Sequence, residues 1–285
     1  MTGASGQLGW ELQRTVPDSV ELFAKSHAEL DICDEQSVAR AFRLHSPELV
    51  VNTAAFTDVD RAEHSRDLAF AINAEGPRLI ARQAADAGGR MIQVSTDYVF
   101  AGDGNTPILP TARTAPNSAY GRSKLAGEKH VLQLLGTQCA VVRTAWLYSR
   151  HGRNFVKTML GLMRSRTNLG VVSDQLGSPT WARELARSIW AFAARADLHG
   201  VYHWTDDGVA SWYDFAVAIR DNGLERGLLK RRVVIDPIPA AAYPTAARRP
   251  RYSVLDKRST IDVLGVSPNH WQTNLSHMLD DLANA

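Results

Sequence analysis

The sequence predicts an α/β fold in which a parallel, doubly wound sheet is followed by a smaller C-terminal α/β lobe. Strand-like and helix-like segments alternate through the first half of the 285-residue chain. A stretch with glycines at positions 3, 6 and 9 opens the first helical segment, and small or polar residues follow three later strand-like runs. Such alternation favours a parallel sheet, because each return to the same sheet edge needs a crossover helix.

Local signals support each element of the first half. Leu8 and Leu12 lie four residues apart and share a helix face, Asp34 is a suitable N-cap, and the paired glycines at 88–89 end an Ala-rich helix. Short apolar runs bounded by polar or turn residues indicate buried strands. The predicted helices are 7–16, 34–45, 67–87 and 119–135, and the predicted strands are 20–24, 48–52, 91–95 and 140–143.

The second half is less regular and predicts a smaller lobe packed on the first. Ser211 is a suitable N-cap, and residues 237–250, rich in Pro and Ala, are expected to be largely loop. We assign 1–150 to a first domain and 151–285 to a second lobe, with a segment near 205–235 as a candidate to return to the first. The expected helices are 154–164, 182–195, 211–222 and 270–282, and the expected strands are 169–173 and 200–204.

The beginning of the chain departs from the usual pattern of such a sheet. A glycine loop of this kind normally follows a central strand of about five residues, but only Met1 and Thr2 precede Gly3. The expected fold is therefore Rossmann-like with a truncated first strand, and we expect the true start to lie upstream. Absence of the rest of this strand would lower the stability of the sheet.

Composition and charge exclude several classes of protein. The formal net charge is +2, so electrostatics gives no reason to expect a nucleic acid partner. Cys33 and Cys139 are far apart, and no Cys/His cluster has metal-ligand spacing. No apolar run is long enough for a membrane span or a signal peptide. We therefore expect a cytoplasmic protein with no membrane partner and no metal site.

The glycine stretch carries the first candidate site. Glycines let backbone N–H groups approach a pyrophosphate closely, and the N-terminus of the following helix favours its negative charge. The spacing G-x-x-G-x-x-G gains weight from the alternating segments that follow it. The candidate cofactor-binding residues here are Gly3, Gly6, Gln7, Leu8 and Gly9.

Lys25 follows the second predicted strand, where the adenosine ribose is normally read. A cation there favours the 2′-phosphate of NADPH over the 2′-hydroxyl of NADH, and a solvated surface lysine is the competing interpretation. Asp31 and Ile32 are candidates for the adenine pocket, with Asp31 accepting from the exocyclic amine or serving only as a cap. These residues predict NADPH, with NADH as the alternative.

Small and polar residues end two further strands of the predicted sheet. Ligands of such sheets bind outside the carboxyl ends of the strands, where small side chains let the backbone pass close to a cofactor. Hydroxyls placed there can hydrogen-bond a carbonyl oxygen that gains negative charge during a reduction. The candidates are Ala54, Ala55 and Thr57 after one strand, and Ser95, Thr96 and Asp97 after the other.

Tyr120 and Lys124 lie four residues apart on a predicted helix and share one face. A free tyrosine has a pKa of about 10, and a neighbouring ammonium lowers it. Tyr120 can then act as general acid toward a ketone oxygen while hydride arrives at carbon. Lys124 can also hold the nicotinamide ribose hydroxyls, so this pair completes a candidate site for ketone reduction.

Weaker candidates lie toward the second lobe. Trp146 follows a strand and could line a sugar pocket or belong to the core. The arginines around 248–251 suit a diphosphate, with a solvated basic loop as the alternative. Glu11, on the first helix, is expected to be a surface carboxylate. The other substrate-side candidates are Asn154, Gln175 and Arg249.

Together these residues resemble the extended short-chain dehydrogenase/reductase family, and within it the reductases that complete dTDP-L-rhamnose synthesis. The resemblance covers almost the whole chain, and the combination of motifs is specific. The matching stretches are 2–12, 51–55, 59–63, 95–100, 120–128, 143–146, 174–180, 243–245 and 249–250.

The resemblance implies a function and roles for individual residues. Thr96, Tyr120 and Lys124 would be the catalytic trio, and Asp97 and Trp146 would help to position a sugar. The reaction would reduce the C4 ketone of dTDP-4-dehydro-β-L-rhamnose with NADPH or NADH. Some family members are magnesium-linked dimers through a glutamate of the first helix, at Glu11 here, so Mg²⁺ stays open and a monomer or homodimer is expected.

Two other functions remain compatible with the sequence. One is another nucleotide-sugar enzyme of the same fold, such as an epimerase, a dehydratase or a different ketoreductase. Related dehydratases carry an acidic pair beside the active-site threonine, whereas Asp97 is followed by Tyr98. The other is a non-catalytic, NADP-binding regulatory subunit like that of methionine adenosyltransferase, which has this fold.

Overall fold

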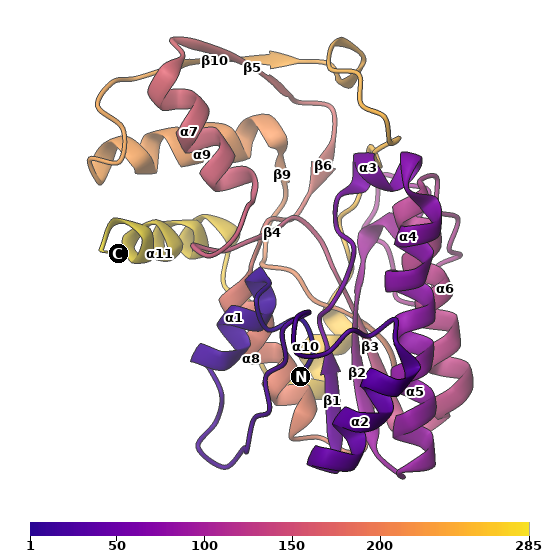
Figure 1. The fold of residues 1–285 in the computed structure, drawn as a ribbon. Helices are drawn as coiled ribbons and strands as arrows, with labels where there is room; N and C mark the ends of the chain where they lie inside the picture. Colours follow the sequence, from indigo (N-terminus) through magenta and orange to yellow (C-terminus); the bar gives the residue numbers. More distant parts are fainter. Residues whose placement is uncertain (285) are drawn as a thin grey trace.

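A four-stranded parallel sheet forms the centre of the larger lobe in the computed structural model, which describes residues 1–284 (Figure 1). Its strand order is β1-β2-β3-β8, and each neighbouring pair is parallel. The predicted alternation of strands and helices is thus confirmed. The strands are β1 (Leu49–Asn52), β2 (Arg90–Thr96), β3 (Cys139–Thr144) and β8 (Gly200–His203).

Helices cover both faces of this sheet, as a doubly wound fold requires. Both faces of the sheet are apolar because successive side chains of a strand point to opposite faces. Val50 and Met91 pack on one face, and Val51 and Ile92 pack on the other. The first face is covered by α2 (Glu35–His45), α5 (Gly76–Asp86) and α6 (Ala119–Leu135). The second is covered by α1 (Gln7–Arg14), α8 (Ala182–Ala193) and α10 (Arg258–Leu264). Asp34 caps α2 as predicted, by accepting from the Gln36 amide.

The sheet continues past β1 through a very short segment. Thr2 forms parallel bridges to both Asn52 and Lys25, and the Lys25 amide donates to the Met1 carbonyl at 2.9 Å. The predicted strand 20–24 is wrong in the described chain, where these residues carry no strand assignment. Backbone hydrogen bonds join this stretch to Met1 and Ala4 through Phe23 and Lys25, which is too little pairing for a strand ladder.

The predicted long helix 67–87 is confirmed as a continuous helical stretch from Arg66 to Asp86, but it contains a π-helical turn that was not predicted. The chain forms α3 (Val59–His64), α4 (Arg66–Phe70), a π-helical turn (Ala71–Glu75) and then α5. The side chain of Asn73 in this turn accepts from the Phe56 amide at 2.8 Å and donates to the Phe56 carbonyl at 3.0 Å. These bonds hold the turn against the segment after β1, which is a tertiary constraint that helical periodicity does not reveal.

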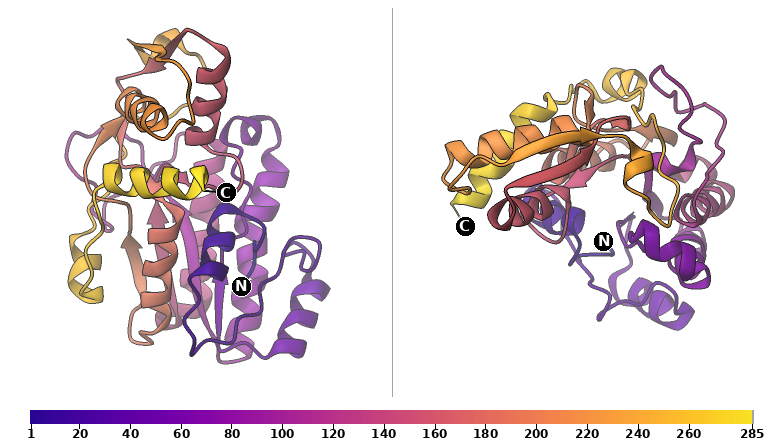
Figure 2. Two further views of the ribbon diagram at one scale, coloured as in Figure 1. Left: turned by 90° about the vertical axis from the view of Figure 1, so that its left-hand side faces the viewer. Right: turned by 90° about the horizontal axis from the view of Figure 1, so that it is seen from above.

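The second lobe has a separate apolar core, in which the buried side chains of Met163, Phe215 and Leu275 meet. It lies above the carboxyl ends of the sheet strands in Figure 1, and Figure 2 shows it from two further sides. Its helices are α7 (Phe155–Ser165), α9 (Trp212–Glu225) and α11 (Trp271–Ala283). Its strands pair as β5 (Asn168–Val172) with β10 (Val234–Ile238), β4 (Leu147–Tyr148) with β7 (Thr180–Trp181), and β6 (Leu176–Gly177) with β9 (Ala210–Ser211).

The chain returns to the larger lobe through different residues from those expected. The segment near 205–235 contains α9, which packs on α7 and α11 in the second lobe. The return runs instead through 182–203, where α8 packs on α1 and β8 joins the sheet, and again through α10. Part of the expected loop 237–250 is the end of β10, where Pro237 lies on a two-stranded edge. No helix among residues 1–284 has the length and apolar character needed to cross a bilayer.

Candidate functional site

A cavity of about 1010 Å³ lies where the glycine loop, the carboxyl ends of β1 to β3 and the second lobe meet. This is the edge at which parallel α/β sheets bind ligands. Sixteen of the predicted site residues line it, so the fold brings together segments that are up to 143 residues apart (146 − 3). They are Gly3, Gly6, Gln7, Leu8, Gly9, Asp31, Ile32, Ala54, Ala55, Thr57, Ser95, Thr96, Asp97, Tyr120, Lys124 and Trp146.

The glycine loop has the geometry of a phosphate cradle. Gly3 has φ of +69°, and a Cβ there would lie 2.7 Å from the amide nitrogen of Ala54. A Cβ on Gly9 would lie 2.2 Å from the Gly3 carbonyl oxygen. Both positions therefore require glycine, and the loop leads directly into the N-terminus of α1 with open space in front of it. These features fit a dinucleotide pyrophosphate.

Thr96 ends β2, Asp97 follows it, and both line the cavity. The Thr96 hydroxyl donates to Asp97 Oδ1 at 3.0 Å and accepts from the Tyr98 amide at 3.2 Å, which starts a short 3₁₀ turn. Burial raises the pKa of the Asp97 carboxyl to about 6, while the hydrogen bond from Thr96 acts in the opposite direction. Thr96 thus presents a fixed hydroxyl to the cavity beside a carboxyl that is half neutral near pH 6.

Tyr120 and Lys124 share the buried face of α6, as predicted from their spacing. Ser118 caps this helix by accepting from the Gly121 amide, and a Cβ on Gly121 would lie 2.2 Å from the Tyr98 carbonyl oxygen. The helix therefore packs closely on the turn after β2, which brings Tyr120 to Thr96. Lys124 donates from Nζ to the Val94 carbonyl at 2.7 Å.

The charge state of this pair differs from the expectation. Burial raises the pKa of the Tyr120 phenol above its ordinary value, and the Thr96 hydrogen bond lowers it only in part. Burial also lowers the pKa of Lys124 to about 8, with the Glu128 carboxylate opposing that change. The predicted lowering of the tyrosine pKa by Lys124 is therefore wrong for this structure, in which burial and the Asp97 charge raise the pKa of Tyr120 and the Thr96 hydrogen bond opposes them. A phenol that keeps its proton is suited to donate it.

Trp146 lines the cavity from the strained start of the second lobe. Its φ is +48°, a left-handed value that is rare outside glycine. Its ring stacks on Trp212 with centroids 3.5 Å apart and planes 6° apart. A Cβ on Gly177 would lie 2.6 Å from the Trp146 ring, so Gly177 also packs closely against the indole. Such a flat apolar wall suits a sugar or base face.

Four predicted residues do not line the cavity. The Lys25 backbone bridges Thr2, and Gln175 is buried elsewhere in the second lobe. Asn154 caps α7 and donates to the Gln7 side chain at 2.9 Å, so it contacts a residue that lines the cavity. Arg249 pairs with Asp60 at 2.9 Å, which ties the loop near 250 to the larger lobe. Their direct roles in binding stay predictions.

Other lining residues were missed by the sequence prediction. His27, Leu30 and Cys33 surround the end of the cavity near Asp31, and Arg153 and Trp212 reach it from the second lobe. The signal for the first three was their position beside the predicted adenine pocket. No local pattern marks the last two, because only the packing of the two lobes brings them to the cavity.

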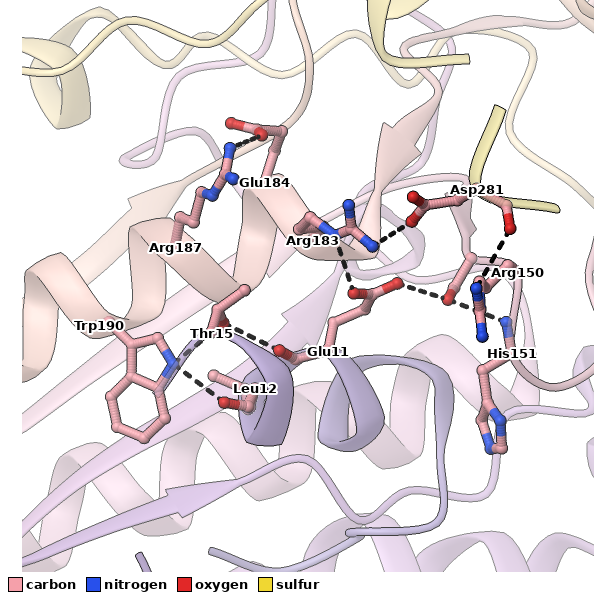
Figure 3. A network of polar contacts seen from close by, with 11 residues as sticks. Glu11, Leu12, Thr15, Arg150, His151, Arg183, Glu184, Arg187, Trp190 and Asp281 are labelled. Carbon is pink, nitrogen blue, oxygen red and sulfur yellow. Dashed lines mark hydrogen bonds and ion pairs between the residues drawn. The ribbon is translucent and has the colours of Figure 1, made fainter. Parts of the chain in front are cut away.

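Glu11 is buried, so its predicted place on the surface is wrong. Its carboxylate accepts from Ser149 Oγ at 2.9 Å and from Arg183 Nε at 3.2 Å (Figure 3). Arg183 also pairs with Asp281. A metal ion at Glu11 would have to displace this guanidinium, so the residues present do not fit a metal there. Residues 1–284 contain no group of three or more His, Cys, Asp or Glu side chains arranged to hold a metal ion.

Comparison with known proteins places this chain in a family. The RmlD substrate binding domain matches residues 1–284. The chain belongs to the RmlD family of NAD(P)-dependent reductases. The dTDP-4-dehydrorhamnose reductase of Escherichia coli K12 is 38% identical to it, over 98% of this chain and 96% of that protein. The dTDP-4-keto-6-deoxy-D-glucose reductase of Streptomyces niveus is 39% identical, over 97% and 94%.

A solved family member adds information on the cofactor. The dTDP-4-dehydrorhamnose reductase of Bacillus anthracis, solved in complex with NADP, has a TM-score of 0.92 and 34% identity to this chain. The alignment covers 98% of this chain and 97% of that one. The fold, including the second lobe, is therefore that of a dinucleotide-dependent reductase.

Proposed function

We propose that this protein reduces the C4 ketone of dTDP-4-dehydro-β-L-rhamnose with NADPH, giving dTDP-L-rhamnose. The observation that carries the proposal is the buried pair of Tyr120 and Lys124 on one face of α6, which lines the same cavity as Thr96 and the glycine cradle. Family membership and the names of the relatives support the substrate class.

The cofactor assignment rests on the cradle and on a relative. Gly3 and Gly9 accept no side chain without a clash, and the cavity beside them extends to Asp31 and Ile32 at its far end. The Bacillus anthracis enzyme was solved with NADP. We therefore favour NADPH over NADH, although the Lys25 side chain does not line the cavity. When bound, the cofactor supplies the hydride.

Each residue of the trio has a definite task. When the substrate is bound, Thr96 Oγ1 turns its single proton from Asp97 Oδ1, its acceptor in this structure, to the ketone oxygen, and so stabilises the negative charge that develops there. Tyr120 donates its phenolic proton to the same oxygen as general acid. Lys124, whose pKa is lowered to about 8 by burial, holds the ribose beside the phenol and provides positive charge when the phenolate forms. Asp97 and the Trp146 indole position the sugar.

A second candidate substrate has specific support. The Streptomyces niveus relative is named for dTDP-4-keto-6-deoxy-D-glucose, and its identity to this chain is as high as that of the dTDP-4-dehydrorhamnose reductases cited above. The two ketones differ in the stereochemistry of the sugar. Contacts with the Trp146 indole, rather than with Thr96, Tyr120 and Lys124, would discriminate between them. Parallel assays with both ketones separate these possibilities, because the preferred substrate has the higher kcat/KM.

The direct test follows NADPH oxidation with dTDP-4-dehydrorhamnose and identifies the product. We expect turnover by the wild type and a loss of at least about 100-fold in Tyr120→Phe, the scale of a lost general acid. NADPH binding without oxidation, together with capture of a methionine adenosyltransferase, would instead indicate a regulatory subunit. Unchanged turnover in Tyr120→Phe would remove Tyr120 as the acid.

A further inference from the structure

The cavity contains a basic side chain with no assigned task. Among the lining residues, His27, Lys124 and Arg153 carry or can carry positive charge. Lys124 is buried and bound to the Val94 carbonyl. Arg153 is exposed, and its guanidinium forms no hydrogen bond or ion pair within residues 1–284. An arginine facing open space in a cavity built for diphosphates is well suited to bind phosphate oxygens.

The segment that carries Arg153 is fixed to the glycine loop, although it belongs to the second lobe. His151 Nε2 lies 3.0 Å from the Ser5 carbonyl oxygen, and the His151 ring stacks on Trp10 with centroids 5.3 Å apart. Asn154 donates to Gln7 Oε1 at 2.9 Å. Contacts on both sides of Arg153 therefore hold its backbone against the loop that leads into α1.

A buried ion-pair network around Glu11 supports the segment that carries Arg153 (Figure 3). Ser149 Oγ donates to Glu11 and accepts from the His151 amide at 3.1 Å. Arg183 and Asp281 complete the network from α8 and α11. The residues that flank Arg153 are thus held by elements of both lobes. The side chain is free, but its point of attachment is fixed.

We propose that Arg153 binds the diphosphate of the dinucleotide cofactor, opposite the glycine cradle. This rests on the proposed function, since it assigns a further residue to the same site. The cofactor is favoured over the sugar nucleotide, the other diphosphate in the reaction, because the anchors on both sides of Arg153 are Ser5 and Gln7 of the glycine loop. Gly152, next to it, has φ of +71° and packs on Gln7, so the backbone turns sharply at this contact.

The test measures cofactor binding directly. The Kd of NADPH is measured by fluorescence titration for the wild type, Arg153→Ala, Arg153→Lys and the control Arg166→Ala, across a series of KCl concentrations. Arg166 is an exposed arginine at the far end of α7, and its side chain forms no hydrogen bond or ion pair within the described chain. We expect Arg153→Ala to raise the Kd about tenfold, the lower range for charged hydrogen bonds, with a smaller salt dependence. Arg153→Lys should recover part of the loss, and Arg166→Ala should match the wild type.

Adenosine 2′-monophosphate, which lacks the diphosphate, should bind all four proteins equally. A raised KM for the sugar nucleotide with unchanged NADPH affinity would overturn the assignment and give Arg153 to the substrate. Unchanged values for both ligands in an active Arg153→Ala enzyme would also overturn it. Absence of NADPH binding by the wild type would instead refute the proposed function itself, so the two failures are distinguishable.

Discussion

Glu128→Gln tests how the fold supports the proposed site. Glu128 and Arg143 are 1% and 4% exposed, and the guanidinium binds both carboxylate oxygens, at 2.9 Å from Nε and 2.7 Å from Nη2. The substitution keeps the shape of the side chain but leaves the Arg143 charge buried without its counterion. Removing one partner of a buried pair costs about 3 to 5 kcal/mol.

Two contacts of Arg143 remain in the variant and place the expected loss near the lower end of that range. The guanidinium still donates to the Pro110 carbonyl at 3.2 Å and lies over the Phe100 ring at 5.0 Å. We therefore expect the apparent free energy of unfolding, measured by urea titration, to fall by about 3 kcal/mol. The control Glu75→Gln breaks a more exposed pair with Arg78 and should cost less than about 1 kcal/mol.

The same substitution should change the pH dependence of catalysis. The Glu128 charge raises the pKa of Lys124 and so opposes the effect of burial. Without it, the ammonium should lose its proton at a lower pH, and the alkaline fall of kcat/KM should begin earlier than in the wild type. A loss of unfolding free energy no larger than that of Glu75→Gln would refute the buried-pair reasoning, and an unmoved alkaline limb would refute the coupling to Lys124.

Two further predictions concern residues of the cavity. In the wild type, kcat/KM should fall as pH rises through about 8, the pKa of Lys124. A Lys124→Met variant should no longer show this alkaline fall. If the fall persists in the variant, the titrating group is not Lys124. The depressed pKa of Lys124 also makes stability rise with pH between about 8 and its ordinary 10.5, because the unfolded chain binds more protons there. Gly177→Ala should displace Trp146, since the added Cβ would lie 2.6 Å from its ring, and raise the KM of the sugar nucleotide about tenfold. The control Gly161→Ala adds a Cβ in open space on a helix and should leave KM unchanged; equal effects of the two would show that Trp146 does not touch the sugar.

Local sequence signals predicted those parts of the fold that depend on local physics. Helix 119–135 coincides with α6, because its apolar face and its ends are encoded within the helix itself. The residues at the carboxyl ends of the strands were also predictable, since a parallel sheet brings those ends to one edge. This explains why the glycine loop, Thr96 and Tyr120 meet in one cavity.

The remaining features depend on contacts between distant segments. The π-helical turn at 71–75 is held by the bonds from Asn73 to the Phe56 backbone. Glu11 is buried because Arg183, 172 residues further along the chain, reaches its carboxylate. Arg153 lines the cavity because the two lobes are packed together. Residue spacing along the chain carries none of this information.

Single-turnover kinetics of Tyr120→Phe test the central claim most directly. Rapid mixing with saturating NADPH and dTDP-4-dehydrorhamnose isolates the chemical step from binding and release. The account predicts a rate at least about 100-fold below that of the wild type, with unchanged Kd for NADPH. An equal single-turnover rate in the two proteins would contradict the assignment of proton donation to the buried phenol of Tyr120.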